Sequence, residues 1–146
     1  MATFVGTQSD FVKALKELIE LDYDAVEAYQ AAINRLDNTT YIEKLESFKA
    51  DHQRHITELS ILLKKHSEDA PTGPSLAKQW LTKGKVVLAN LVGDNTILSA
   101  MRSNEEDTNK AYERMQNYPD MWQDGIEILK RGLEDERRHK AWFDTI

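Results

Sequence analysis

Apolar residues recur every three or four positions in four long stretches of this chain, which is the spacing of one face of an α-helix. The first two stretches place on such a face Phe11, Leu15, Leu18, Asp22, Ala25, Tyr29, Ala32 and Leu36, and then Ile42, Leu45, Phe48, His52, His55, Leu59 and Leu62. The last two place there Leu98, Met101, Glu105, Thr108, Tyr112 and Met115, and then Trp122, Ile126, Leu129, Leu133, Glu136, His139 and Phe143. The pattern predicts helices at about residues 8–37, 41–66, 95–117 and 120–144.

The breaks between these stretches predict how the helices are arranged. The first and last breaks are short, so the first and second helices, and the third and fourth, should be antiparallel neighbours. The middle connection is long and contains Pro71, Gly73 and Pro74, which do not fit inside a helix. An amphipathic stretch at about residues 75–91 predicts a short crossover helix that covers the open flank of the bundle. We predict an all-α fold, an antiparallel four-helix bundle with one long crossover, as a single domain over residues 1–146 with a frayed leader at residues 1–6.

Composition and charge agree with this fold and exclude several kinds of function. Of 146 residues, 40% are hydrophobic and 30% charged, with only 6 Gly and 3 Pro, which is typical of long helices. Because there is no Cys, disulfides, iron–sulfur clusters and thiolate zinc sites are excluded. The net charge of −6 disfavours nonspecific nucleic-acid binding. The chain shows neither a signal-peptide pattern nor an apolar run of about 20 residues, so we expect a soluble, cytoplasmic protein with no membrane partner.

Six ionisable residues lie on the otherwise apolar helix faces: Asp22, His52, His55, Glu105, Glu136 and His139. Burying a carboxylate or an imidazole without a partner costs several kcal/mol. A pair of divalent metals at the centre would take up the lone pairs of all six, and carboxylate and imidazole ligands suit iron or manganese. The alternative is a polar core network held by hydrogen bonds alone. At a rise of about 1.5 Å per residue, Asp22 and His52 both lie roughly 20 Å from the loop that joins their helices, so the two can meet.

The candidate ligands of the second and fourth helices belong to a repeated motif. Residues 51–55 read DHQRH and residues 135–139 read DERRH. Each copy places two potential ligands three residues apart, so both project from one face of the helix. A second repeat links the other two helices, because Asp22 precedes Tyr29 by seven residues and Glu105 precedes Tyr112 by seven. We predict that the charged neighbours are solvent-exposed, namely Asp51, Arg54, Glu106, Asp135 and Arg138.

At these motifs the chain resembles the ferritin-like superfamily, and its rubrerythrin and bacterioferritin branch in particular, over residues 11–143. In that family an acidic residue followed seven later by Tyr marks the first helix, as Asp22 and Tyr29 do here. The family's Glu-x-x-His is present as Glu136 and His139. The resemblance implies a ferritin-like bundle with a non-haem di-iron carboxylate site. It also implies the roles of the residues: terminal ligands Asp22 and Glu105, bridging carboxylate Glu136, one imidazole on each metal from His55 and His139, and carboxylate-orienting hydroxyls from Tyr29 and Tyr112.

His52 departs from the family pattern, because it stands where the family has its second bridging carboxylate. A neutral imidazole cannot bridge two metals as a carboxylate does. Three alternatives therefore remain: a di-metal site of altered geometry, a site for one metal, or no metal. The residues that would suffice for one metal are His52, His55, Glu136 and His139.

The resemblance implies a metal-binding protein that reacts Fe(II) with dioxygen or peroxide, as a ferroxidase or a peroxidase does. Its cofactor would be two iron ions, with manganese or zinc as alternatives. A peroxidase would need an external electron donor, because the chain has no Cys for a rubredoxin-type module. The alternative function is a non-catalytic stress or scaffold bundle whose site is degenerate or holds one metal. A homodimer and an iron-storing shell both stay open as assemblies.

Overall fold

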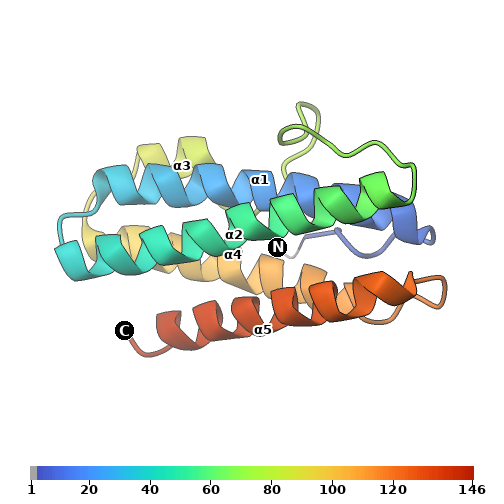
Figure 1. The fold of residues 1–146 in the computed structure, drawn as a ribbon. Coiled ribbons are helices and arrows are strands. Elements are labelled where there is room, and N and C mark those ends of the chain that lie inside the picture. Colours follow the sequence, from blue (N-terminus) through green and yellow to red (C-terminus); the bar gives the residue numbers. More distant parts are fainter. Residues whose placement is uncertain (1–2) are drawn as a thin grey trace.

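A computed structural model of the protein describes residues 3–146, and Figure 1 shows the path of the chain. Four long helices run side by side: α1 (Phe11–Arg35), α2 (Thr39–Lys65), α4 (Asp94–Met115) and α5 (Ile126–Phe143). Helix α1 packs against α2 and α4, and α5 packs against α4 and α2. The short helix α3 (Lys85–Ala89) lies against α1, and a 3-10 helix, η1 (Gln123–Gly125), precedes α5. Over the described part of the chain no strand forms, so the prediction of an all-α protein is confirmed.

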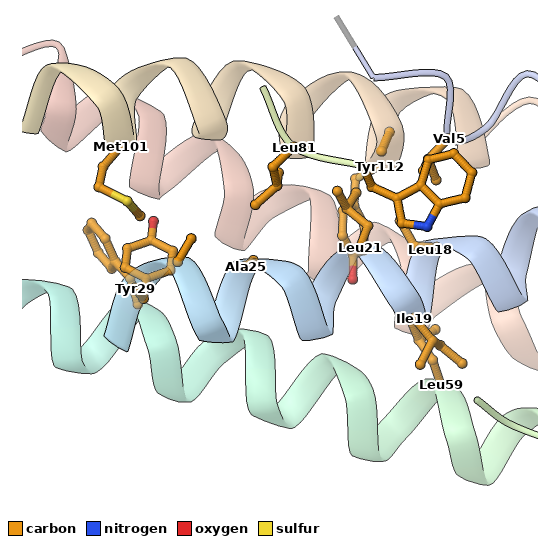
Figure 2. Close-up of a cluster of buried hydrophobic side chains, with 14 of the residues drawn as sticks. Val5, Leu18, Ile19, Leu21, Ala25, Tyr29, Leu59, Leu81, Met101 and Tyr112 are labelled. Atoms are coloured by element: carbon orange, nitrogen blue, oxygen red, sulfur yellow. The ribbon is translucent and has the colours of Figure 1, made fainter. Parts of the chain in front are cut away.

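The apolar helix faces meet in a common core. Figure 2 shows one part of this core, where side chains of α1 and α2 meet those of α4, the N-terminal segment and the crossover. The labelled residues are Val5, Leu18, Ile19, Leu21, Ala25, Tyr29, Leu59, Leu81, Met101 and Tyr112. None of the helices at residues 3–146 has the length and the apolar character that crossing a membrane requires.

The crossover differs from the predicted helix at residues 75–91, since only Lys85–Ala89 is helical. Backbone N–H groups in the preceding segment bind side chains of α1 and α4 instead of their own turn. These bonds run from Trp80 to Asp24 at 3.2 Å, from Thr82 to Asp107 at 2.8 Å, and from Lys83 to Asn104 at 2.9 Å. Because side chains satisfy the backbone, Trp80 and Leu81 reach the core without a helix.

The last long helix begins later than predicted, at Ile126 rather than at residue 120. Asp120 lies in the loop before α5, and its carboxylate accepts the backbone N–H of Phe11 at 3.3 Å at the start of α1. Ile126, predicted to face the core, is 39% exposed as a result of its place at the helix start.

The N-terminal segment is docked rather than frayed over its described part. Val5 is fully buried, and the backbone N–H of Thr3 donates to Asp107 at 3.1 Å. The Arg114 guanidinium donates to the carbonyl of Val5 at 3.0 Å. Gly6 has φ +88°, and a Cβ there would lie 2.6 Å from the Arg114 Cβ, so this close approach to α4 requires glycine. Residues 1–2 of the predicted leader lie outside the described residues.

Gly132 lets α5 approach the ring of Tyr112, and it yields a first prediction. A Cβ at this position would lie 2.5 Å from Cε1 and 3.0 Å from Cδ1 of Tyr112. We expect Gly132→Ala to lower the free energy of unfolding by about 1–3 kcal/mol through overpacking, despite the helix propensity of Ala, which favours it by about 1 kcal/mol. Urea denaturation of the variant measures this. The matched control is Gly73→Ala, which meets nothing within 4 Å. A Gly132→Ala protein more stable than wild type would contradict the close packing.

Candidate metal centre

The structure brings all six predicted site residues together at the centre of the bundle. Helix α1 supplies Asp22, α2 supplies His52 and His55, α4 supplies Glu105, and α5 supplies Glu136 and His139. All six are buried, with His55 the most accessible at 5%. The i, i+3 spacing on α2 and on α5 projects both residues of each pair from one helix face. Four helices therefore direct six ionisable side chains to one place.

These residues form two overlapping groups, in each of which the candidate ligand atoms lie within 4.8 Å of one another. We call them the Asp22 group, made of Asp22, His52, His55 and Glu136, and the Glu105 group, made of His52, Glu105, Glu136 and His139. His52 and Glu136 are shared by both groups.

Within the Asp22 group the hydrogen bonds converge on the Asp22 carboxylate. Its Oδ1 lies 2.8 Å from Nδ1 of His52 and 3.4 Å from Nδ1 of His55. Its Oδ2 accepts the hydroxyl of Tyr112 at 2.7 Å. Both oxygens of this buried carboxylate are therefore occupied.

Within the Glu105 group the Glu105 carboxylate accepts hydrogen bonds, while its three neighbours each have at least one ligand atom without a hydrogen bond. Glu105 accepts the hydroxyl of Tyr29 on Oε1 and that of Thr108 on Oε2 at 3.1 Å. Oε1 also lies 3.7 Å from Nε2 of His52 and 3.3 Å from Nδ1 of His139. Neither imidazole atom makes a hydrogen bond, and neither does either oxygen of Glu136.

Glu136 lies between the three imidazoles. Its Oε1 is 3.5 Å from Nε2 of His52 and 3.6 Å from Nδ1 of His55, and its Oε2 is 3.5 Å from Nδ1 of His139. One carboxylate oxygen thus faces both groups and the other faces only the Glu105 group.

Each tyrosine of the seven-residue repeat donates its hydroxyl to the acidic residue of the other helix. Tyr29 of α1 donates to Glu105 of α4, and Tyr112 of α4 donates to Asp22 of α1. Each hydroxyl is fully buried with its ring, so each fixes the orientation of the acidic residue on the other helix.

Two aspartates of the repeated motif bind the candidate ligands, which corrects the prediction that they are only solvated surface groups. Asp51 of α2 lies 2.8 Å from Nε2 of His139 on α5, and Asp135 of α5 lies 2.9 Å from Nε2 of His55 on α2. Their side chains are 20% and 16% exposed. A carboxylate on the outer nitrogen of an imidazole fixes the ring and leaves the inner nitrogen free to bind a metal.

Two arginines of the motif hold these aspartates in the seam between α2 and α5. Arg138 donates to Asp51 at 2.8 Å and to Asp135 at 2.9 Å, and Arg54 donates to Asp135. Both arginines are exposed, as predicted, but their contacts belong to the site. The sequence signal for this function was the repeat itself, because Asp and Arg recur in both copies.

The buried charges set the direction of each pKa in the metal-free protein. Burial would lower the pKa of His52, but Glu136 and the hydrogen bond to Asp22 raise it to about 10. The pKa of His55 rises against burial to about 9, because of hydrogen bonds to Asp135 and Asp22. The pKa of His139 likewise rises to about 12 through Glu105 and Asp51. The neighbouring carboxylates therefore favour the protonated form of all three imidazoles in the metal-free protein.

The pKa values of the three buried carboxylates are shifted as well, two downward and one upward. Burial would raise the pKa of Asp22, but hydrogen bonds from His52 and His55 lower it. Burial is likewise outweighed at Glu105, where His139 holds the pKa below its usual range. At Glu136 burial prevails, and its pKa is raised. Protonation of the imidazoles thus favours the charged forms of Asp22 and Glu105.

The unpartnered atoms fit a divalent metal ion. Buried nitrogen and oxygen atoms without hydrogen bonds are costly and rare in proteins. Here His52, Glu136 and His139 together present four of them at the same place. Imidazole and carboxylate together suit first-row transition metals. The six buried residues could thus hold a metal ion.

Fold and site together define an all-helical protein with a buried carboxylate and imidazole cluster. The model of a family described as a domain of unknown function, DUF2383, matches residues 10–117. The chain therefore belongs to this family. The matched residues include four of the six site residues and end before Glu136 and His139. No curated protein and no solved structure matches the chain.

Proposed function

We propose that this protein is a ferritin-like four-helix bundle that binds iron in its core and reacts Fe(II) with dioxygen or peroxide. The observation that carries the proposal is the set of four buried atoms without hydrogen bonds, on His52, Glu136 and His139. A polar network that existed for stability alone would pair such atoms, because each unpaired one costs about 1–3 kcal/mol. A metal ion would pair all four.

Some side chains of such a site would bind the metal, and others would orient the ligands. His52, Glu105, Glu136 and His139, with Asp22 and His55, are the residues that would hold metal. Bound iron would supply the redox chemistry: two Fe(II) ions give up one electron each, which with two protons reduces dioxygen to hydrogen peroxide or peroxide to water. Asp51 and Asp135 orient the imidazoles, and Tyr29 and Tyr112 orient the acids. Burial of all six residues keeps bulk water from the site.

A second function is favoured by His52. This imidazole replaces a carboxylate of the ferritin-like pattern, and it is already hydrogen-bonded to Asp22. The alternative is therefore a non-catalytic bundle that holds one metal. In that case the protein would bind metal without oxidising Fe(II).

Metal content tests the proposal directly. Protein purified without chelators should contain iron, and anaerobic Fe(II) should raise its melting temperature, because a ligand that binds only the folded state stabilises it. Less than about 0.2 equivalents of iron, manganese or zinc, with no stabilisation by Fe(II), would contradict metal binding. Exposure of the Fe(II)-loaded protein to oxygen or peroxide then separates the two functions, since only the first oxidises the iron faster than the same Fe(II) concentration in buffer without protein.

A further inference from the structure

We infer that the two halves of the cluster differ, and that one divalent ion binds tightly in the Glu105 group while Asp22 acts as a positioning residue for His52. The ligands would be Nε2 of His52, Nδ1 of His139, and the carboxylates of Glu105 and Glu136. This inference rests on the proposed function, because it assumes that metal binds in the core. It differs from a symmetric pair of metals, in which Asp22 and Glu105 would be equivalent ligands.

The buried atoms without a hydrogen bond are not shared evenly between the two groups. Among the six candidate ligands, these atoms are Nε2 of His52, Nδ1 of His139 and both oxygens of Glu136. All four belong to residues of the Glu105 group, and His139 lies outside the Asp22 group. In the Asp22 group, by contrast, Asp22 uses both oxygens and His55 uses both nitrogens. A metal entering the Glu105 group would satisfy free atoms, whereas a metal entering the Asp22 group would have to break existing bonds.

The His52 ring is oriented by its hydrogen bond to Asp22. Its Nδ1 lies 2.8 Å from Oδ1 of Asp22, which places the N–H on this side of the ring. Nε2 is then the nitrogen left to bind a metal, and it faces Glu136 at 3.5 Å and Glu105 at 3.7 Å. Asp22 therefore stands to His52 as Asp51 stands to His139: a carboxylate on one nitrogen directs the other toward metal.

His55 and His139 occupy equivalent places in the sequence repeat but have different hydrogen-bond partners. Each has Nε2 bound to an aspartate of the other helix. Nδ1 of His139 has no hydrogen-bond partner, but Nδ1 of His55 is directed at Asp22 at 3.4 Å. Residues that the repeat makes equivalent are thus in different states, and only His139 is free to bind.

The test uses the repeat as its own control. Chelator-treated wild-type protein is titrated with Co(II), followed by calorimetry and by the visible absorption of the bound ion, which reports nitrogen and oxygen ligands. We expect one tight ion per chain. His139→Gln should weaken it by more than about 100-fold, since a lost ligand exceeds the 10–100-fold typical of a lost outer partner. His55→Gln should change the affinity by less than about threefold, and Asp22→Asn should weaken it about tenfold through His52.

Each outcome separates this inference from the proposed function. Equal losses in His55→Gln and His139→Gln, or two wild-type ions of equal affinity, would overturn the inference and leave metal binding in place. Absence of Co(II) binding by the wild-type protein would overturn both. Far-UV circular dichroism identifies a variant that does not fold. If His139→Gln does not fold, Glu105→Gln replaces it, and it should lose the ion that Asp22→Asn retains.

Discussion

Replacing Glu136 with Gln should abolish metal binding in the core. Glu136 belongs to both groups of candidate ligands, and both of its oxygens lack a hydrogen-bond partner. The amide is neutral and offers only one weak oxygen donor, so the variant loses the one carboxylate that faces all three imidazoles. We expect the affinity for Mn(II) to fall by more than about 1,000-fold, which corresponds to about 4 kcal/mol.

Calorimetric titration with Mn(II) measures this loss, and the same helix provides a matched control. Glu134→Gln makes the same chemical change at an exposed position two residues away. It should bind Mn(II) as the wild type does, since it removes one surface charge and no ligand. A Glu136→Gln protein that folds by circular dichroism and still binds within about tenfold of wild type would show that Glu136 is not a ligand.

The metal-free protein should become less stable as the pH rises from about 6.5 toward 10. The pKa of His52, His55 and His139 lies near 6.5 in the unfolded chain, but at about 10, 9 and 12 in the folded protein. The folded state therefore binds more protons than the unfolded state above pH 6.5. The stability that this provides is fully present below about 6.5 and is lost as the pH rises through the folded values, by several kcal/mol in all.

Melting temperatures of chelator-treated protein between pH 6 and 10 test this prediction. Metal should reverse the trend, because ligands must be deprotonated to bind and affinity then rises with pH. The difference between the melting temperatures with and without Mn(II) should therefore widen from pH 6 to pH 8. A metal-free melting temperature that stays constant or rises over this range would show that the three imidazoles are not protonated in the folded state.

The long helices were predictable because their stability comes from burying one face, and the spacing of apolar residues shows which face that is. The crossover was not, because its structure depends on distant partners. Side chains of α1 and α4 accept the backbone N–H groups of Trp80, Thr82 and Lys83, and the sequence of residues 75–91 does not indicate these acceptors. The later start of α5 was not predicted either, and the carboxylate of Asp120, in the loop before it, accepts the backbone N–H of Phe11 on α1.

In the site, the sequence indicated which residues would be buried and that Asp22 can meet His52, which lies 2.8 Å away, but it did not indicate the other pairs. Asp22 and His52 stand on apolar faces, so their burial followed from spacing alone. The pairing of Asp51 with His139 did not, because Asp51 lies at the edge of the core face of its own helix and its partner is on another. Spacing along one helix cannot reveal which side chain a neighbouring helix presents.

The exchange of partners between the two hairpins has a consequence for how such a chain can diverge. The α1–α2 hairpin carries His55, but its supporting carboxylate, Asp135, belongs to the α4–α5 hairpin, and His139 depends in the same way on Asp51. Neither hairpin is a complete unit. A substitution of Asp51 removes the hydrogen-bond partner of His139, which lies in the other half of the chain. A substitution at either aspartate therefore alters the setting of a histidine in the other half of the chain, and a fragment made of one hairpin would carry a histidine without the aspartate that orients it.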